Sequence, residues 1–283
     1  LQFLGTFDGG GYEISGLYIN NRSALYQGLF GYLGEGAVVQ NLGVSGSVAG
    51  YYHVGGVVGE NHGTVSGCYN TGDVNGSYSN VGGVVGRNYG IVSDAYNTGE
   101  VSGGNVHVGG VAGYNAGYGD VIDSYNTGGV TGGGDVGGVV GFNNNGSVTA
   151  CYYLAGSAAT SGGGSALTAV QFADQNSFSG WDFRTVWTMD ALLGRPVLIG
   201  AREPGGWHGG SGTQDDPYII SDLEALERFR DSVNGGNTYE GQYVKIELED
   251  GVTAIDMSSK YGATAGEGAK ATLLSVLDRM LGE

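Results

Sequence analysis

The sequence predicts an all-β fold: a parallel β-helix (β-solenoid) of about six coils, followed by a small α+β C-terminal segment. The first observation is a repeat. Val-Gly-Gly-Val-Val-Gly begins at Val54, Val81 and Val136, and Val-Gly-Gly-Val-Ala-Gly begins at Val108. The spacings of 27, 27 and 28 residues are typical of a repeat architecture, in which each unit buries its apolar face against its neighbours. The second is the number of glycines, 60 in 283 residues.

Each unit contains short runs of β-prone residues separated by glycine or asparagine. This glycine density excludes helices from the repeats, because an interior glycine costs about 0.5–1 kcal/mol relative to alanine. It permits short strands with corners at Gly and Asn, since these residues tolerate positive φ. Three short strands in about 27 residues make one coil, and coils stack at the strand spacing of ~4.8 Å. The expected columns are Val54, Val81, Val108 and Val136; Val57, Val84, Val111 and Val139; Val65, Val92 and Val148 with Ile122 in the same row; Asn70, Asn97 and Asn126; and Tyr69, Tyr96, Tyr125 and Tyr152.

The two cysteines provide a check on this alignment. Cys68 and Cys151 fall in one column with Leu42, Ala95 and Ser124, whose small or apolar side chains indicate an inward position. Three coils separate the two cysteines, ~14 Å at the strand spacing. A disulfide needs Cα atoms within about 7 Å. We therefore expect two free, buried thiols.

The chain is expected to divide into three parts. Residues 1–200 form the β-helix array, closed over its open end by an aromatic cap at 178–198 that contains two Trp and two Phe. Residues 201–214 are expected to be a linker. Residues 215–283 begin a second module, with a helix at 222–233, a strand at 243–248 and a C-terminal helix at 269–281. The chain starts at Leu1 without methionine, so we expect it to be a fragment that has lost any targeting segment.

Charge and composition exclude several classes of protein. Only three prolines and no Gly-X-Y period exclude collagen. The 28 acidic against 11 basic residues give a net charge of −17, which repels nucleic acid and anionic lipid. No apolar run approaches the ~20 residues that span a bilayer, so membrane insertion is not expected.

The repeat units resemble the GLUG motif of bacterial surface proteins, which include adhesins and immunoglobulin-A-cleaving metalloendopeptidases. The matching residues are Gly55-Gly56-Val57-Val58-Gly59, Val65, and Cys68-Tyr69-Asn70 with Gly72 and Val74, together with their later copies. The resemblance covers residues 3 to about 250. It implies a right-handed parallel β-solenoid in a cell-surface or secreted, extracellular setting, and it implies no catalytic residues.

Candidate site residues lie in three columns. Asp94 stacks on Asp123, and Asp73 on Glu100, so each pair is a solvated acidic stripe, a calcium site or a pair of glycosidase carboxylates. If Tyr69, Tyr96, Tyr125 and Tyr152 point outward, they form an aromatic strip that can stack on sugars or apolar partners; if they point inward or lie beneath a loop, they are packing residues. His53 and His107 share a column with Asn80 between them, and too few ligands converge there for zinc.

Two functions follow from these patterns. The preferred one is a non-enzymatic structural or adhesive module of a bacterial surface protein or extracellular fibre. Such a rigid rod joins head to tail with other modules or identical subunits. The alternative is a carbohydrate-binding or carbohydrate-active β-helix that uses the stacked carboxylates and the tyrosine strip. No cofactor is expected beyond calcium, and the expected partners are glycans or proteins of a host or cell surface.

Overall fold

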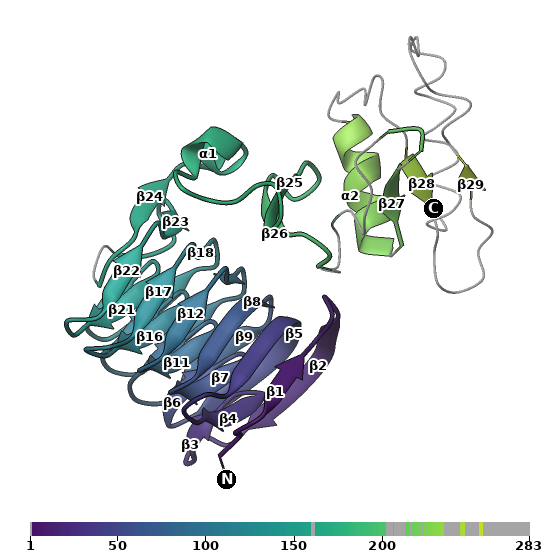
Figure 1. Cartoon of the computed structure of the whole chain (residues 1–283). Helices are drawn as coiled ribbons and strands as arrows, with labels where there is room; N and C mark the ends of the chain where they lie inside the picture. The colour runs from purple at the N-terminus through teal and green to yellow at the C-terminus, as the bar shows by residue number, and fades with distance from the viewer. Residues whose placement is uncertain are drawn as a thin grey trace. The chain divides into compact units, whose positions relative to one another are not determined.

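A parallel β-solenoid makes up most of the described chain (Figure 1). The computed structural model describes residues 2–159, 162–201, 206, 213–215, 217–221, 223–234, 244–246 and 255–256. The chain forms two units, Leu1–Met189 with Pro196–Ala201, and Asp190–Arg195 with Arg202–Glu283. In the first unit the strands of successive coils pair in parallel, and between residues 52 and 154 the paired residues are 27 to 29 positions apart. The predicted fold class is confirmed.

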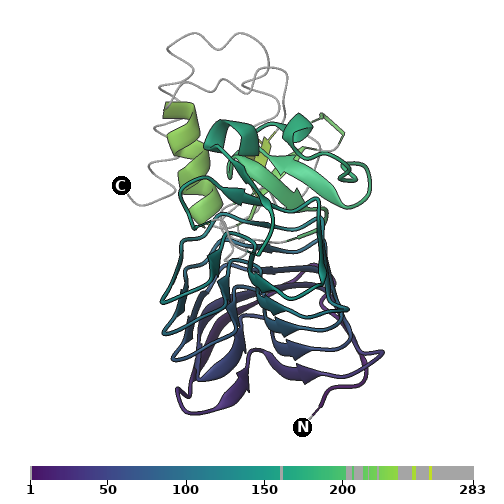
Figure 2. The same ribbon diagram turned by 90° about the vertical axis from the view of Figure 1, so that its left-hand side faces the viewer.

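The coils carry three sheets, and Figure 2 shows the coils as stacked rungs. Face I is a five-stranded sheet of β4 (Phe30–Leu33), β7 (Val58–Asn61), β11 (Val85–Asn88), β16 (Ala112–Asn115) and β21 (Val140–Asn143). Face II is a five-stranded sheet of β3 (Leu25–Gln27), β6 (Tyr52–Gly55), β10 (Val81–Gly82), β15 (Val108–Gly109) and β20 (Val136–Gly137). The large sheet has fourteen strands: β1 (Thr6–Asp8), β2 (Glu13–Asn20), β5 (Val38–Gly50), β8 (Thr64–Asn70), β9 (Asp73–Gly76), β12 (Ile91–Ser93), β13 (Tyr96–Asn97), β14 (Val101–Gly103), β17 (Asp120–Ile122), β18 (Tyr125–Asn126), β19 (Val130–Gly132), β22 (Ser147–Thr149), β23 (Tyr152–Leu154) and β24 (Ser165–Leu167).

The core consists of columns of like side chains, as the repeat predicts. Val81 pairs with Val54 on one side and with Val108 on the other, and Val108 pairs with Val136. Val57, Val84, Val111 and Val139 are fully buried. Because each valine lies on another valine of the next coil, one packing solution repeats along the solenoid.

One predicted column is wrong by a residue. Val92 pairs with Val121, and Ile122 pairs with Ser93, so Val121 takes the inward position that was assigned to Ile122. The cause is the turn that precedes β17, which is longer than its counterpart in the previous coil. Asn88 lies three residues before Ile91, whereas Asn115 lies five residues before Asp120.

A ladder of buried asparagines explains the second glycine of the first three Val-Gly-Gly motifs. Asn70 Nδ2 donates to Asn97 Oδ1 at 2.7 Å, and Asn97 Nδ2 donates to Asn126 Oδ1 at 2.8 Å. A Cβ at Gly83 would collide with the side chain of Asn97, and Gly110 stands in the same relation to Asn126. The glycine therefore provides the room that the amide ladder occupies.

A second asparagine ladder, which the sequence analysis missed, runs along Face I. Asn61 Nδ2 donates to Asn88 Oδ1 at 2.8 Å and Asn88 Nδ2 to Asn115 Oδ1 at 2.9 Å; Asn115 then donates to Asn143 at 3.1 Å. Asn61, Asn88 and Asn115 are completely buried. Each amide also donates to a backbone carbonyl at the adjacent corner, so these ladders fix the corners as well as joining the coils.

Both cysteines are free and buried, as predicted. Cys68 pairs in register with Leu42. Burial raises the pKa of both thiols to about 12, so the residues serve as small apolar core side chains.

Residues 168–189 and 196–201, here called the strap, return along one flank of the solenoid. The strap contains α1 (Ala169–Phe172), the 3-10 helix η1 (Gln175–Ser177) and the paired strands β25 (Trp187–Asp190) and β26 (Arg195–Leu198). Thr168 caps α1 with a reciprocal bond to Gln171. The aromatic rings of the strap contact tyrosines of three successive coils. Phe178 contacts Tyr152, and Trp187 contacts both Tyr125 and Tyr96. The expected cap over an open end is thus a cover along the side.

The second unit contains a parallel pair, β27 (Tyr218–Ile220) with β28 (Val244–Ile246), and β28 also pairs antiparallel with β29 (Ile255–Asp256). Helix α2 spans Leu223–Asn234, where the sequence places a helix at 222–233, and it buries Leu226 and Phe229. The expected C-terminal helix at 269–281, and all but four residues of the expected linker, lie outside the described residues. Within the described part of the chain, no helix is both long and apolar enough to cross a membrane.

Candidate functional site

The tyrosine column does not form an exposed strip. Tyr69, Tyr96 and Tyr125 are at most 1% exposed, and Tyr152 is 9% exposed. The rings stack face to face, with centroids 4.9 Å apart for Tyr69–Tyr96 and 5.0 Å for Tyr96–Tyr125. The expectation of an outward, ligand-binding strip is wrong for these four residues, and the packing alternative is correct.

The strap buries these tyrosines and forms hydrogen bonds with the hydroxyls of two of them. The Tyr125 hydroxyl donates to the carbonyl of Pro196 at 2.6 Å, and the Tyr152 hydroxyl accepts from the backbone N–H of Ser179 at 3.0 Å. Buried phenols usually find such partners. The bonds join coils and strap, which lie 27 and 71 residues apart in the chain, so sequence spacing alone could not reveal them.

Asp94 and Asp123 stack at one corner of adjacent coils, as predicted. Both adopt the left-handed backbone conformation, with φ of 51° and 45°, which aspartate tolerates better than most residues. Burial raises the pKa of both carboxyls, and each carries a further upward contribution from a neighbouring carboxylate: Asp182 for Asp94, and Asp94 for Asp123. Like charges at this corner therefore favour the protonated forms.

Asp73 and Glu100 also stack, and each carboxylate accepts from the backbone of the next coil. The N–H of Glu100 donates to Asp73 Oδ1 at 3.4 Å, and the N–H of Gly129 donates to Glu100 Oε1 at 3.3 Å. Among the residues that the structure describes, no group of three or more His, Cys, Asp or Glu side chains is arranged to hold a metal ion. Calcium binding at either pair stays a prediction.

The side chains most suited to binding lie on the outer side of Face I and its corner with Face II. We call this surface the aromatic face. Its rings contact one another at centroid distances of 4.6 to 5.9 Å. The rings are those of Tyr26, Tyr32, Tyr51, Tyr52, His53, His62, Tyr78, Tyr89, His107, Tyr114 and Phe142.

One row of the aromatic face crosses all five strands of Face I. Tyr32 pairs with Glu60, Glu60 with Arg87, Arg87 with Tyr114, and Tyr114 with Phe142. Glu60 and Arg87 therefore lie side by side, with the half-exposed ring of Tyr32 next to Glu60 and that of Tyr114 next to Arg87. Neighbouring strands lie ~4.8 Å apart, so these side chains form a continuous line along the solenoid.

Glu60 is the buried centre of this row, with 7% of its side chain exposed. Its Oε1 lies 2.8 Å from Nε2 of His62, and its Oε2 lies 3.4 Å from Nδ1 of His53 and 3.8 Å from Nη1 of Arg87. Oε2 makes no hydrogen bond within the structure. A buried carboxylate oxygen without a hydrogen bond is uncommon and calls for an explanation.

Arg87 lies against two rings of the aromatic face, those of Tyr89 and Tyr114. Its guanidinium carbon lies 4.5 Å from the ring centre of Tyr89 and 5.4 Å from that of Tyr114, which is cation–π geometry. The Nε atom of Arg87 is buried and has no hydrogen-bond partner in the structure. An unsatisfied donor therefore accompanies the unsatisfied acceptor of Glu60.

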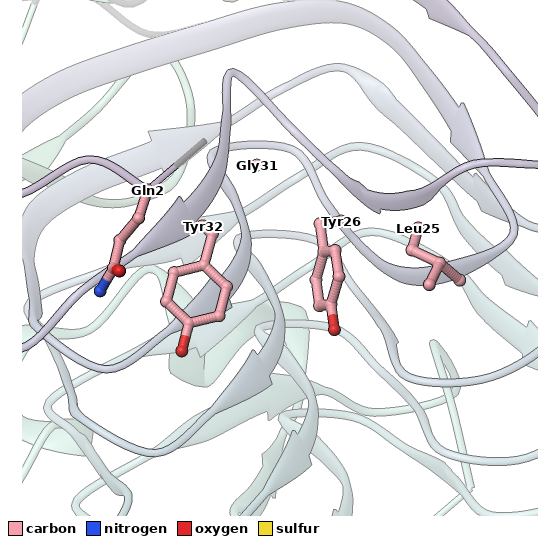
Figure 3. Close-up of a pocket in the computed structure, with 5 residues that line it drawn as sticks. All are labelled: Gln2, Leu25, Tyr26, Gly31 and Tyr32. Atoms are coloured by element: carbon pink, nitrogen blue, oxygen red, sulfur yellow. The ribbon is translucent and has the colours of Figure 1, made fainter.

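A cavity of about 450 Å³ opens at the N-terminal end of the aromatic face, lined by Gln2, Leu25, Tyr26, Gly31 and Tyr32. Figure 3 shows the two tyrosine rings side by side, with both hydroxyls directed away from the ribbon on the same side. Gln2 lies next to Tyr32 and adds an amide to the rim. The cavity thus combines apolar ring surface with a few polar groups, as small-ligand sites do.

The predicted histidine column is present at the edge of this face. Nδ1 of His107 lies 2.9 Å from Oδ1 of Asn80, and Nε2 of His107 lies 3.4 Å from Asp135. Burial lowers the pKa of His107 and, more strongly, that of His53, which falls to about 4. His53 is therefore neutral near pH 7.

The sequence carries a signal for this row. The position after Val-Val-Gly or its equivalent varies among four types of large residue, while the glycine before it is constant. These residues are Tyr32, Glu60, Arg87, Tyr114 and Phe142. Within a strand, neighbouring residues face opposite sides, so a variable position beside an invariant inward one marks the outer surface.

The fold and its columns define the chain as a β-solenoid repeat protein. Residues 50–75, 77–102 and 104–131 each match the family model of the GLUG motif. The chain therefore contains three GLUG motifs in tandem, and the resemblance that the sequence indicated is confirmed.

Known proteins share parts of this chain. A halomucin of Haloquadratum walsbyi is 38% identical over 76 residues, which is 26% of this chain and 1% of the halomucin. A proposed Gly-rich membrane protein of Evansella cellulosilytica is 40% identical over 68 residues, 23% of this chain and 8% of the relative. The chain thus spans only a small part of either relative.

A crystal structure from Bacteroides ovatus, of a protein proposed to be an immunoglobulin A1 protease, has a similar fold. The TM-score is 0.52 at 22% sequence identity, and the match covers 68% of this chain and 76% of that one. This likeness concerns the fold alone.

Proposed function

We propose that this chain is a non-catalytic structural module of a bacterial cell-surface or extracellular protein, acting as a stiff rod segment. The observation that carries the proposal is the unbroken coil-to-coil bonding of the two asparagine ladders. Each coil is held to the next by backbone hydrogen bonds, and the coils between Asn61 and Asn143 are also joined by buried amide pairs. Bending or stretching the rod must disturb many of these bonds together.

The relatives support this setting. Their printed names, a halomucin and a proposed Gly-rich membrane protein, suit repeat regions of large surface or secreted proteins. The net charge of −17 keeps an exposed rod soluble and separate from its neighbours. We propose an adhesive role and head-to-tail joining with further modules or copies as the finer functions of such a rod.

Electron microscopy of the purified chain tests the mechanical part of the proposal. We expect straight particles of uniform width, and ordered end-to-end filaments if copies join directly. Imaging with and without a calcium chelator shows whether the stacked pairs Asp94–Asp123 and Asp73–Glu100 hold an ion that the assembly needs. Flexible, kinked or globular particles would overturn the proposal of a stiff rod.

The non-catalytic part needs a separate assay. The chain is incubated with immunoglobulin A1 and with neutral and acidic polysaccharides, and the products are separated by electrophoresis and chromatography. We expect no turnover above the blank. Cleavage of any substrate, lost in an Asp94→Asn or Asp123→Asn variant, would overturn it.

A further inference from the structure

The N-terminal end of the solenoid carries an incomplete coil. The first strands of the chain cover the large sheet, where β1 and β2 pair with β5. On Face I the same stretch contributes an isolated bridge between Phe3 and Leu33. Among the described strands, β3 and β4 are the last of their sheets, and Figure 1 shows both at the end of the stack near the N-terminus. Faces I and II thus end in an edge to which a further coil could be added.

The later coils show which backbone groups face such an added coil. The carbonyl of Ser79 accepts from the N–H of His53 in the preceding coil at 3.3 Å, and the carbonyl of Asn80 accepts from the N–H of Val54 at 3.0 Å. The same pair of bonds recurs one coil further on. Two adjacent carbonyls at this corner therefore receive N–H groups from the coil before them.

Leu25 and Tyr26 occupy these two columns in the second coil, one coil before Tyr52 and His53. Their carbonyls therefore face the position of a preceding coil. The side chain of Gln27 takes that position instead: its Nε2 donates to the carbonyl of Leu25 at 2.7 Å and to that of Tyr26 at 3.2 Å. Both bonds are exposed, so an incoming strand can replace this one amide with two backbone N–H groups and leave no buried group unsatisfied.

The cavity of about 450 Å³ lies at the same edge, because its lining comes from β3, β4 and the chain before them. Figure 3 shows Leu25 and Tyr26 beside each other along this edge. Leu25 is 47% exposed and Tyr26 is 38% exposed, whereas His53, which follows Tyr26 in the same column, is 8% exposed. The incomplete coil therefore leaves apolar surface open at a corner that the next coil buries.

An extended segment of the repeat suits this edge. Exposed sheet edges bind extended segments through main-chain hydrogen bonds, while side-chain pockets select the sequence. Within the array, residues 79–88 lie in the corresponding position against β15 and β16. The N–H groups of Asn80 and Val81 donate there to the carbonyls of Val106 and His107. The parallel interface that joins one coil to the next thus continues across the edge of β3 and β4.

We propose that the outer edge of β3 and β4 binds an extended Val-Gly-Gly-Val-Val-Gly segment of another repeat module, in parallel orientation. The N–H groups of the segment replace the Gln27 amide on the carbonyls of Leu25 and Tyr26. This inference rests on the head-to-tail joining proposed above, because it names the surface at which one module receives the next.

Fluorescence anisotropy with a labelled peptide of residues 79–88 tests the proposal on the intact chain. We expect saturable binding of this peptide. Two control peptides should bind at least about tenfold more weakly: one with the same residues in scrambled order, and one with N-methyl groups on Asn80 and Val81. N-methylation keeps the side chains and removes the two backbone donors.

Three variants of the chain locate the binding. Leu25→Lys should weaken binding by about tenfold or more, because lysine on an edge strand opposes pairing. Ile91→Lys is the matched control, since Ile91 is 41% exposed on β12, which has a strand on each side; its affinity should stay within about twofold of the wild type. Gln27→Ala should strengthen binding by about threefold, because it frees the two carbonyls.

Thermal unfolding by circular dichroism establishes that each variant is folded. If Leu25→Lys fails to fold, Gln27→Ala and the N-methylated peptide decide. The proposal is overturned by unsaturable binding of the peptide, by equal affinity of the N-methylated peptide, by weaker binding in Gln27→Ala, or by equal losses in Leu25→Lys and Ile91→Lys.

Sedimentation velocity separates the other occupant of the edge. Self-association of the chain that Leu25→Lys abolishes, without binding of the peptide, would assign the edge to a second copy and overturn the proposal. Straight particles in electron micrographs that bind no peptide would leave the rod intact and remove only the edge site. Kinked particles that bind the peptide would remove the rod and keep the edge site.

Discussion

His53 shows how much one side chain of the aromatic face depends on its burial. Its φ is 55°, its ring stacks on that of Tyr26, and its Nδ1 lies 3.4 Å from Oε2 of Glu60. Burial lowers its pKa from 6.5 to about 4, Glu60 acts in the opposite direction, and Arg87 lowers it further. The folded protein therefore keeps His53 neutral in mildly acidic solution.

The contribution of His53 to the free energy of unfolding should fall as the pH drops from about 6.5 to 4. Over this range the unfolded chain binds a proton on His53 that the folded chain does not bind. Above pH 6.5 the residue is neutral in both states, and below pH 4 it is charged in both. Asp94 and Asp123 act oppositely, because their raised pKa values favour the folded state in acid.

A His53→Asn variant isolates the histidine contribution. Asn80 occupies the same column in the next coil with a φ of 60°, so asparagine suits the backbone there. Urea denaturation at a series of pH values should show a smaller acid loss in the variant than in the wild type. Parallel pH profiles for the two proteins would contradict the depressed pKa.

The asparagine ladders are the elements that join one coil to the next. We expect Asn97→Ala to lower the free energy of unfolding by about 2–4 kcal/mol, because it removes several buried hydrogen bonds. The bonds are those with Asn70, Gly99 and Asn126. Equilibrium denaturation measures the change. Asn20→Ala, at an exposed residue with a bond to Tyr18 only, serves as control; an equal loss in both variants would show that the ladder adds nothing.

The sequence predicts columns well where the motif repeats without insertion. Val54, Val81 and Val108 lie as predicted, since identical spacing on both sides leaves one register. It fails at Ile122, where a longer turn shifts the chain before Val121 resumes the column. The length of a repeat shows that it contains extra residues, but it does not show at which corner of the coil these residues lie.

The burial of the tyrosine column could not be predicted from the repeat, although its direction could. Alternation with Cys68 places Tyr69 on the outside of the coil, and the structure agrees that it points away from the cysteine core, into a separate cluster. It is buried because Leu198 and the aromatic residues of the strap cover that flank. Contacts between segments so distant in the sequence depend on the path of the chain, which the spacing of the repeats does not encode.

For the whole solenoid unit, the strap contributes a large share of the stability. Trp187 is fully buried and contacts Tyr96, Tyr125 and Trp181. Trp187→Ala should cost about 3–5 kcal/mol and weaken the near-ultraviolet circular dichroism of the tyrosine stack. Val170→Ala, at an 81% exposed position of the same segment, should change neither quantity. A loss below about 1 kcal/mol in Trp187→Ala would mean that the coils are stable without the strap.

The length of the strap also matches the number of coils that it crosses. It starts beside Tyr152 on a late coil, passes Tyr125 and Tyr96, and ends with Gly200 against Gly11 at the first coils. A Cβ on Gly11 would collide with the Gly200 carbonyl, so the far end is closely seated. The columns alone would tolerate the gain or loss of a whole 27-residue unit, whereas the strap has one length. It thus acts as a ruler: an array longer by one coil would outgrow it, and a shorter array would leave it slack, so recombination between repeats is constrained by a segment outside them.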